Sequence, residues 1–103
     1  MNQMQQMMRQ AQKMQAQILK VQEEMGDHRE EATAGGGVVT VGASGKGEIL
    51  DVRIAPEAVR PEDAEMLQDL VVVAANEALR KAREAVEGAL KKVTGGAGLP
   101  GLF

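Results

Sequence analysis

Hydrophobic residues near the start of the chain recur at alternating spacings of three and four positions. The series comprises Met4, Met7, Ala11, Met14, Ile18, Val21 and Met25. This spacing is that of a coiled-coil seam, which is narrower than the apolar stripe of an ordinary surface helix, and we call the series the heptad seam. It predicts a helix over residues 3–25, about 35 Å long, that ends at Gly26. A helix of that length should project from the body of the protein or pair with a partner helix.

From Arg29 the hydrophobic period changes to two, which is typical of strands. The expected strands cover residues 29–34, 38–43 and 46–54, and a two-residue hairpin turn is expected at Ser44-Gly45. In the third strand one side carries Leu50, Val52 and Ile54, and the other carries Ile49, Asp51 and Arg53. One buried face and one solvent-exposed face predict a small antiparallel sheet over residues 29–54.

A second helical pattern covers residues 61–93, with Pro61 at its first position and glycine after its end. The run Leu70 to Ala75 is apolar on every side of such a helix and needs covering from more than one direction. The chain has one Phe and no Trp or Tyr, so its own core is thin. We therefore predict that a second copy of the chain covers part of this helix. The expected interface residues are Leu67, Leu70, Val71, Val72, Val73 and Ala74.

The 103 residues are expected to form one α+β domain of order α-β-β-β-α, with residues 94–103 as a flexible tail or a short docking segment. The absence of cysteine excludes disulfides, thiolate metal sites and Cys nucleophiles. His28 is the only histidine, and the glycine clusters lack phosphate-loop spacing. No nucleophile–base pair is apparent. The sequence thus predicts no enzyme activity, no metal, no cofactor and no small-molecule substrate, and nothing in it predicts a signal peptide or a membrane span.

Charge is unevenly distributed although the net charge is only −3. Residues 1–22 contain three basic residues and no acidic residue, and residues 80–93 are also locally basic. Basic side chains on a helix face can neutralise phosphates without reading bases. The candidate phosphate-binding residues are Arg9, Lys13, Lys20, Arg80, Lys81, Arg83, Lys91 and Lys92. From spacing alone, ordinary solvated helix faces are the more common explanation of such residues.

The order of several short sequence segments along the chain favours the phosphate-binding interpretation over ordinary solvated helix faces. After the Met/Gln-rich opening come EATAGGGVVTV at 31–41, GKGEILDVRI at 45–54, MLQDLVVVAANEAL at 66–79 and TGGAGLPG at 94–101. With these strings the chain resembles the YbaB/EbfC family of bacterial nucleoid-associated DNA-binding proteins over nearly its whole length. The resemblance implies a tweezer-like homodimer with projecting paired helices. It also implies binding of double-stranded DNA with modest sequence preference, a role in nucleoid organisation or gene regulation, and a cytoplasmic location on the nucleoid.

The sequence supports two hypotheses about function. In the first, a homodimer binds duplex DNA through phosphate contacts, and Arg9, Lys13 and Lys20 line the cleft between its arms. In the second, the heptad seam is a protein-docking surface, and the chain is a coiled-coil adaptor that does not bind nucleic acid. Recognition of single-stranded nucleic acid is disfavoured, because the chain offers almost no aromatic side chain on which bases could stack.

Overall fold

The computed structural model describes residues 2–95, which form an elongated body of 74 × 21 × 15 Å. Its elements follow the order α1 (Asn2–Gly26), β1 (Arg29–Ala34), β2 (Val39–Ser44), β3 (Ile49–Ile54) and α2 (Ala64–Val93). Two short 3₁₀ turns, Pro56–Ala58 and Pro61–Asp63, connect β3 to α2. This order confirms the predicted α-β-β-β-α architecture. The expected tail falls mostly on residues 96–103, which lie outside the described residues.

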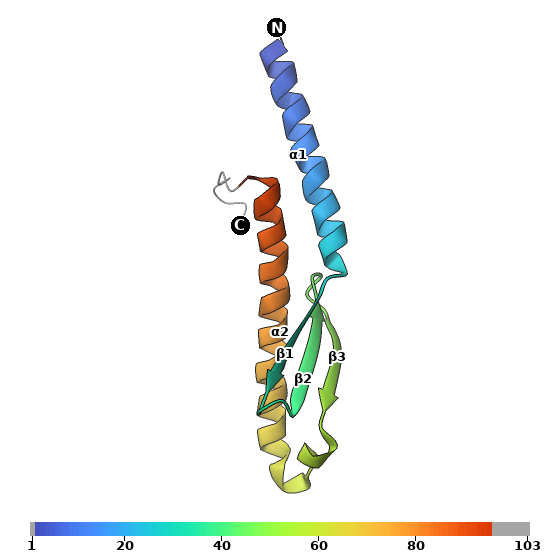
Figure 1. Ribbon diagram of the computed structural model, residues 1–103, viewed down its shortest axis with the longest axis vertical. Helices are drawn as coiled ribbons and strands as arrows, with labels where there is room; N and C mark the ends of the chain where they lie inside the picture. Colours follow the sequence, from blue (N-terminus) through green and yellow to red (C-terminus); the bar gives the residue numbers. More distant parts are fainter. Residues whose placement is uncertain (1, 96–103) are drawn as a thin grey trace.

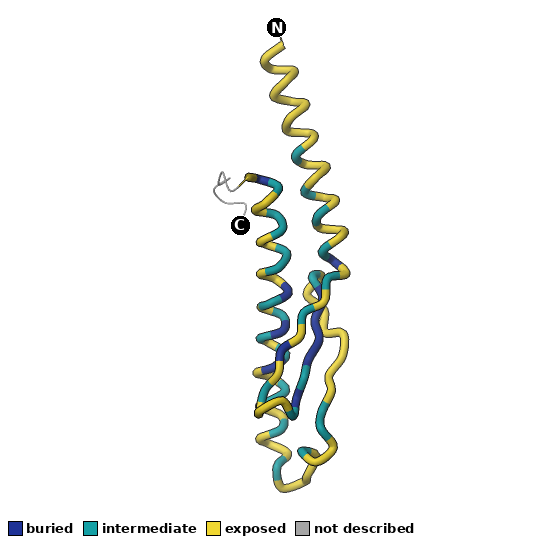
Figure 2. The backbone as a smooth tube through the Cα atoms, in the orientation of Figure 1, coloured by how far each residue is buried: buried dark blue, intermediate teal, exposed yellow. Residues whose placement is uncertain are grey.

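The sheet is antiparallel in the order β1-β2-β3, and α2 covers one of its faces (Figure 1). The central strand β2 supplies the fully buried Val39, Val41 and Ala43, and α2 meets them with Ala74 and Ala78. Small alanine side chains let the helix approach the sheet closely. The core is therefore a thin layer between β2 and one face of α2, as the lack of aromatic residues predicts (Figure 2).

The second hairpin differs from its prediction. A two-residue turn at Ser44-Gly45 is wrong: the connection runs through residues 45–48, and the Gly47 amide donates to the Ser44 carbonyl at 2.9 Å. Gly47 has a φ of 84°, a left-handed conformation that favours glycine. A register shift at Gly42/Ala43 then places Ile49 opposite Ala43. The third strand accordingly starts at Ile49, three residues later than expected.

The two faces of β3 only partly follow the prediction. Val52 pairs with the buried Val41 and so lies on the helix side of the sheet, as expected. However, α2 packs mainly on β1 and β2, and Ile49, Leu50 and Val52 remain exposed within the single chain. An apolar strip along β3 is therefore left uncovered.

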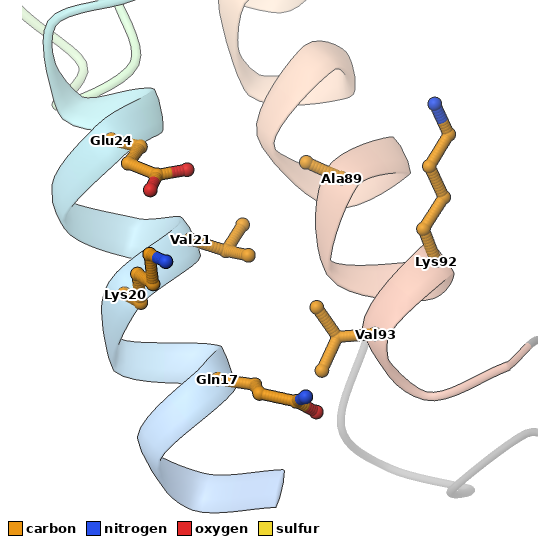
Figure 3. Close-up of a pocket in the computed structure, with 7 residues that line it drawn as sticks. All are labelled: Gln17, Lys20, Val21, Glu24, Ala89, Lys92 and Val93. Carbon is orange, nitrogen blue, oxygen red and sulfur yellow. The ribbon is translucent and has the colours of Figure 1, made fainter.

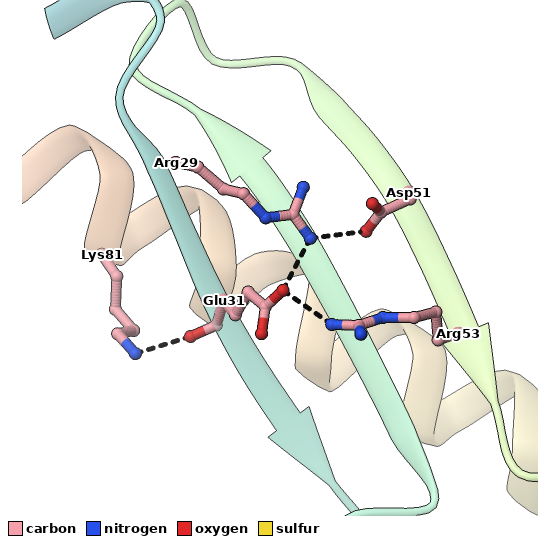
Figure 4. Close-up of polar contacts among 5 residues, drawn as sticks. All are labelled: Arg29, Glu31, Asp51, Arg53 and Lys81. Atoms are coloured by element: carbon pink, nitrogen blue, oxygen red, sulfur yellow. Dashed lines mark hydrogen bonds and ion pairs between the residues drawn. The ribbon is translucent and has the colours of Figure 1, made fainter.

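The opposite face of the sheet carries a network of charged side chains (Figure 4). Arg29 on β1 donates to Glu31 at 2.7 Å and to Asp51 on β3 at 2.9 Å, and Arg53 donates to Glu31 at 2.6 Å. The hydrogen bonds from Arg29 hold the pKa of both carboxyl groups below their usual ranges. Because these groups are exposed, such ion pairs contribute little to stability. The polar face predicted for Asp51 and Arg53 is confirmed.

The helix α1 runs antiparallel to α2, but the two overlap over only part of their lengths (Figure 1). Met14, Ile18, Val21 and Met25 of the heptad seam are partly buried, whereas Met4, Met7 and Ala11 are exposed. The N-terminal half of α1 extends past the end of α2 as a solitary arm (Figure 2). We call residues 2–13 the arm.

The base of α1 is held by the β2–β3 hairpin at Gly45. The Gly45 amide donates to the His28 carbonyl at 2.9 Å, and a Cβ added at Gly45 would lie 1.8 Å from the Met25 carbonyl oxygen.

The change Gly45→Ala is therefore expected to cost about 1–3 kcal/mol of unfolding free energy by overpacking. Gly88→Ala is the matched control, because its Cβ would meet nothing within 4 Å. That change should instead stabilise α2 by about 0.5–1 kcal/mol. Urea unfolding measures both, and equal effects would contradict the close approach at Gly45.

Candidate nucleic-acid interface

Three cations form one row along α1. Arg9, Lys13 and Lys20 are four and seven residues apart, all three are exposed, and no acidic residue occurs before Glu23. Arg9 and Lys13 each lie two residues from Ala11 of the heptad seam, so they point about 160° away from it around the helix. Arg9 and Lys13 therefore face solvent on the side of α1 away from the seam, whereas Lys20 lies at the edge of the groove between α1 and α2. We call Arg9, Lys13 and Lys20 the basic row.

An open groove of about 560 Å³ separates the overlapping parts of α1 and α2 (Figure 3). Val21 on α1 faces Ala89 and Val93 on α2, so the floor of the groove is apolar. Lys20 and Lys92 stand at its edges together with Gln17 and Glu24. The groove thus brings one lysine of the basic row near the basic end of α2, where Lys91 is also exposed.

The basic residues earlier in α2 have contacts of their own. Arg80 donates to Glu84 at 2.6 Å and to Glu77 through two nitrogens, and this pairing holds the pKa of Glu77 below its usual range. Lys81 donates to the Glu31 carbonyl oxygen at 2.6 Å and so ties α2 to β1 (Figure 4). Arg83 is exposed, but it lies beside the β2–β3 hairpin.

The eight sequence-predicted cations therefore divide into two groups. Those of the basic row, with Arg83, Lys91 and Lys92, form no ion pair with another residue in the described range 2–95. Arg80 and Lys81 are engaged in helix and sheet contacts, which the sequence did not predict. The signal for Arg80 was present in its acidic neighbours three residues before it and four residues after it, a spacing typical of helical ion pairs.

The six predicted interface residues also differ in exposure. Ala74 is fully buried in the core of its own chain, and Leu67, Leu70 and Val71 are partly buried against that core. Val72 and Val73 remain 58% and 57% exposed. Val72 lies seven residues before Leu79, which lines a hollow with the β2–β3 hairpin, so Val72 is on the β3 side of α2. The exposed apolar strip of β3 lies on that same side.

No other type of site is apparent in the described part of the chain. Residues 2–95 contain no cluster of three or more His, Cys, Asp or Glu side chains placed to hold a metal ion. Neither α1 nor α2, over the same range, combines length with enough apolar character to cross a membrane. The exposed cations thus remain the main candidate for binding chemistry.

Comparison with known protein families shows to which family the chain belongs. The model of the YbaB/EbfC DNA-binding family matches residues 1–97. The chain belongs to this family. The YbaB/EbfC family is a DNA-binding family and not an enzyme family, as the sequence predicts.

Curated relatives resemble the chain over nearly their whole lengths. A protein of Desulforamulus reducens is 56% identical over 97% of this chain and 95% of its own length, and it is named a nucleoid-associated protein. A protein of Pelotomaculum thermopropionicum with the same name is 50% identical over the same shares. A crystal structure of an uncharacterized Helicobacter pylori protein superposes with a TM-score of 0.62 at 26% identity, covering 76% of this chain and 90% of that one.

Proposed function

We propose that a homodimer of this YbaB/EbfC chain binds duplex DNA, mainly through phosphate contacts from its two arms. The basic row carries this proposal, because it places three exposed cations along α1, two of them on the solitary arm, and no acidic residue occurs before Glu23. Spaced by four and seven residues, these cations lie about 6 Å and 10 Å apart along the helix axis. A row of this kind can follow a phosphate backbone without entering a groove.

The chemistry of the row favours contacts to phosphates over contacts to bases. A duplex carries one charge per roughly 1.7 Å of its axis, so cations at many positions along it find a phosphate partner. Base reading usually needs planar bidentate side chains fixed in a groove. Two of the three members of the row are lysines, whose flexible ammonium groups are point charges. We therefore infer modest sequence preference, with Lys91 and Lys92 adding charge beside the base of the arm.

The dimer is supported by the apolar surface that the single chain leaves uncovered. Ile49, Leu50 and Val52 on β3 and Val72 on α2 are exposed on the same side of the molecule. A monomeric domain with so thin a core gains burial by covering such a surface with a second copy. In this dimer Val72 is the member of the predicted set that reaches the partner, and Leu67, Leu70, Val71 and Ala74 support it from within each chain, whereas Val73 lies about 100° further around α2.

The biological role follows the names of the relatives. Curated proteins about 50% identical to this chain are named nucleoid-associated proteins. We propose the same location for this chain, on the bacterial nucleoid in the cytoplasm, with roles in nucleoid organisation and gene regulation. Phosphate-dominated binding suits such roles, because it operates at most positions along a chromosome.

A gel shift with three probes of equal length tests the proposal. We expect two unrelated duplexes to bind with similar affinity and a single strand of the same sequence to bind more weakly, while light scattering gives the mass of a dimer. Absence of any shift at low salt would contradict DNA binding. If a protein partner were captured through the heptad seam under those same conditions, the adaptor hypothesis would replace it.

A further inference from the structure

The heptad seam is covered over only part of its length. Where α1 overlaps α2, its residues Met14, Ile18 and Val21 are partly buried. Beyond the end of α2, Met4 and Met7 are 74% and 68% exposed, and with Met8 and Ala11 they line a shallow apolar hollow. The spacing of the seam is unbroken across the two parts. The arm thus presents an apolar face on the side that α2 would occupy if it were longer.

The end of α2 lies beside that face. Val93 lines the groove beside Gln17 of α1, and the helix ends there with the Gly95 amide donating to the Lys92 carbonyl. Gly95 has a φ of 67°, the left-handed conformation typical of a helix C-terminus. Pro100 is incompatible with the interior of a helix continued beyond Gly95. The chain therefore leaves α2 beside the middle of α1, at the lower end of the uncovered face.

The remaining residues match this face in length. From Gln17 to Met4 is 13 positions, or about 20 Å along the helix axis. Residues 96–103 can span up to about 26 Å when extended. Laid along α1 at about 2.5 Å per residue, short of full extension, Leu99 would reach the level of Ala11, and Leu102 and Phe103 would reach the levels of Met7 and Met4.

The remaining residues also match the face in chemistry. Residues 96–103, GAGLPGLF, contain no charged side chain and hold the only aromatic residue of the chain, Phe103. Methionine side chains adapt to irregular partners and make favourable contacts with aromatic rings. A short apolar segment packed against Met4, Met7 and Met8 would continue the contact that α2 makes with the partly buried seam residues of α1.

We propose that residues 96–103 dock on the arm of the same chain and cover Met4, Met7 and Met8 of α1. The docked segment, which we call the strap, extends the α1–α2 contact and stiffens the arm. Because the basic row lies about 160° away around the helix, the strap leaves Arg9 and Lys13 open. The proposal is independent of the proposed DNA binding, and it is tested without DNA.

Engineered cysteines provide the test, because the natural chain contains none. The full-length protein carrying Met7→Cys and Leu102→Cys is compared with one carrying Gln5→Cys and Leu102→Cys. Gln5 is exposed, is two residues from Met7 and points away from the seam. Docking raises the effective concentration of the first pair, so its intrachain disulfide should form about tenfold faster or more under mild oxidation. Met7 is exposed, so its replacement leaves the core intact.

Mass spectrometry of mixed heavy-isotope and light-isotope chains separates the outcomes. A fast disulfide within one chain at Met7→Cys, repeated at Met4→Cys, supports the strap. Equal rates for the Met7→Cys and Gln5→Cys proteins would overturn it, as would disulfides formed mainly between two chains. As a second readout, deleting residues 96–103 should speed peroxide oxidation of Met4 and Met7 severalfold, and an unchanged rate would count against docking.

Discussion

Replacing Arg9, Lys13 and Lys20 together by glutamine is expected to lower the affinity for random-sequence duplex DNA by about 10²-fold or more near 0.1 M salt. Each dimer loses six cations, three from the basic row of each chain. If each neutralises one phosphate, the slope of log affinity against log salt becomes less steep by about 5. Glutamine keeps the helix propensity and a flexible polar side chain, although a shorter one, and removes the charge. Fluorescence anisotropy at several salt concentrations measures both quantities.

The matched control removes the same charge from the body of the protein. Changing Lys46, Arg53 and Arg60 to glutamine gives the same net charge, but these residues lie away from the arm, in or beside the sheet and before α2. This variant should bind duplex DNA within a few-fold of the natural chain, since charge distant from the contact acts only through a screened field. Equal losses in the two triple variants would show that overall charge, rather than the basic row, determines binding.

Replacing Val72 by aspartate is expected to split the homodimer. Val72 is 58% exposed in the single chain, so the change should leave the subunit folded. In the dimer it would bury two unpaired carboxylates, one from each chain, at a cost of several kcal/mol. The dissociation constant of the dimer should rise by at least about 10²-fold, since 1.4 kcal/mol corresponds to a factor of ten. Sedimentation velocity at micromolar concentration would then give the mass of a monomer.

Val59→Asp provides the control for that experiment. Val59 is also an exposed valine, at 61%, but it lies between the two 3₁₀ turns and outside the proposed interface. Its replacement should leave the dimer intact. The split Val72 variant should also bind DNA more weakly and with a shallower salt dependence, because one arm contributes half of the phosphate contacts. A Val72→Asp protein that remained a dimer would place the interface elsewhere.

The periodicity of the sequence was sufficient to predict the elements. Seam spacing defined α1 to within one residue at each end, and the period of two located the three strands, although β3 begins three residues later than predicted. The start of α2 was less accurate, because Pro61–Asp63 forms a 3₁₀ turn and the α-helix begins at Ala64. Proline and acidic residues favour either kind of first turn, so local signals could not distinguish them.

The packing of the helices and strands on one another could not be predicted from the sequence. Whether α2 lies over β2 or β3 depends on tertiary contacts, and the actual position leaves Val52 exposed although its pattern marks it as buried. The same holds for the ion pairs that link β1 to β3 across β2, since partners 22 residues apart carry no local signal. For the candidate site, the basic row could be predicted because one helix carries it. The contact of Lys81 with β1 required the structure.

The most direct test of the central claim is the salt dependence of duplex binding by the natural protein. A dimer that uses the basic rows of both chains neutralises about six phosphates, so log affinity plotted against log salt between 50 and 200 mM should fall on a straight line of slope near −5. Lys91 and Lys92 would make the line steeper. An affinity that stayed constant over this range would contradict phosphate-dominated binding by the arms.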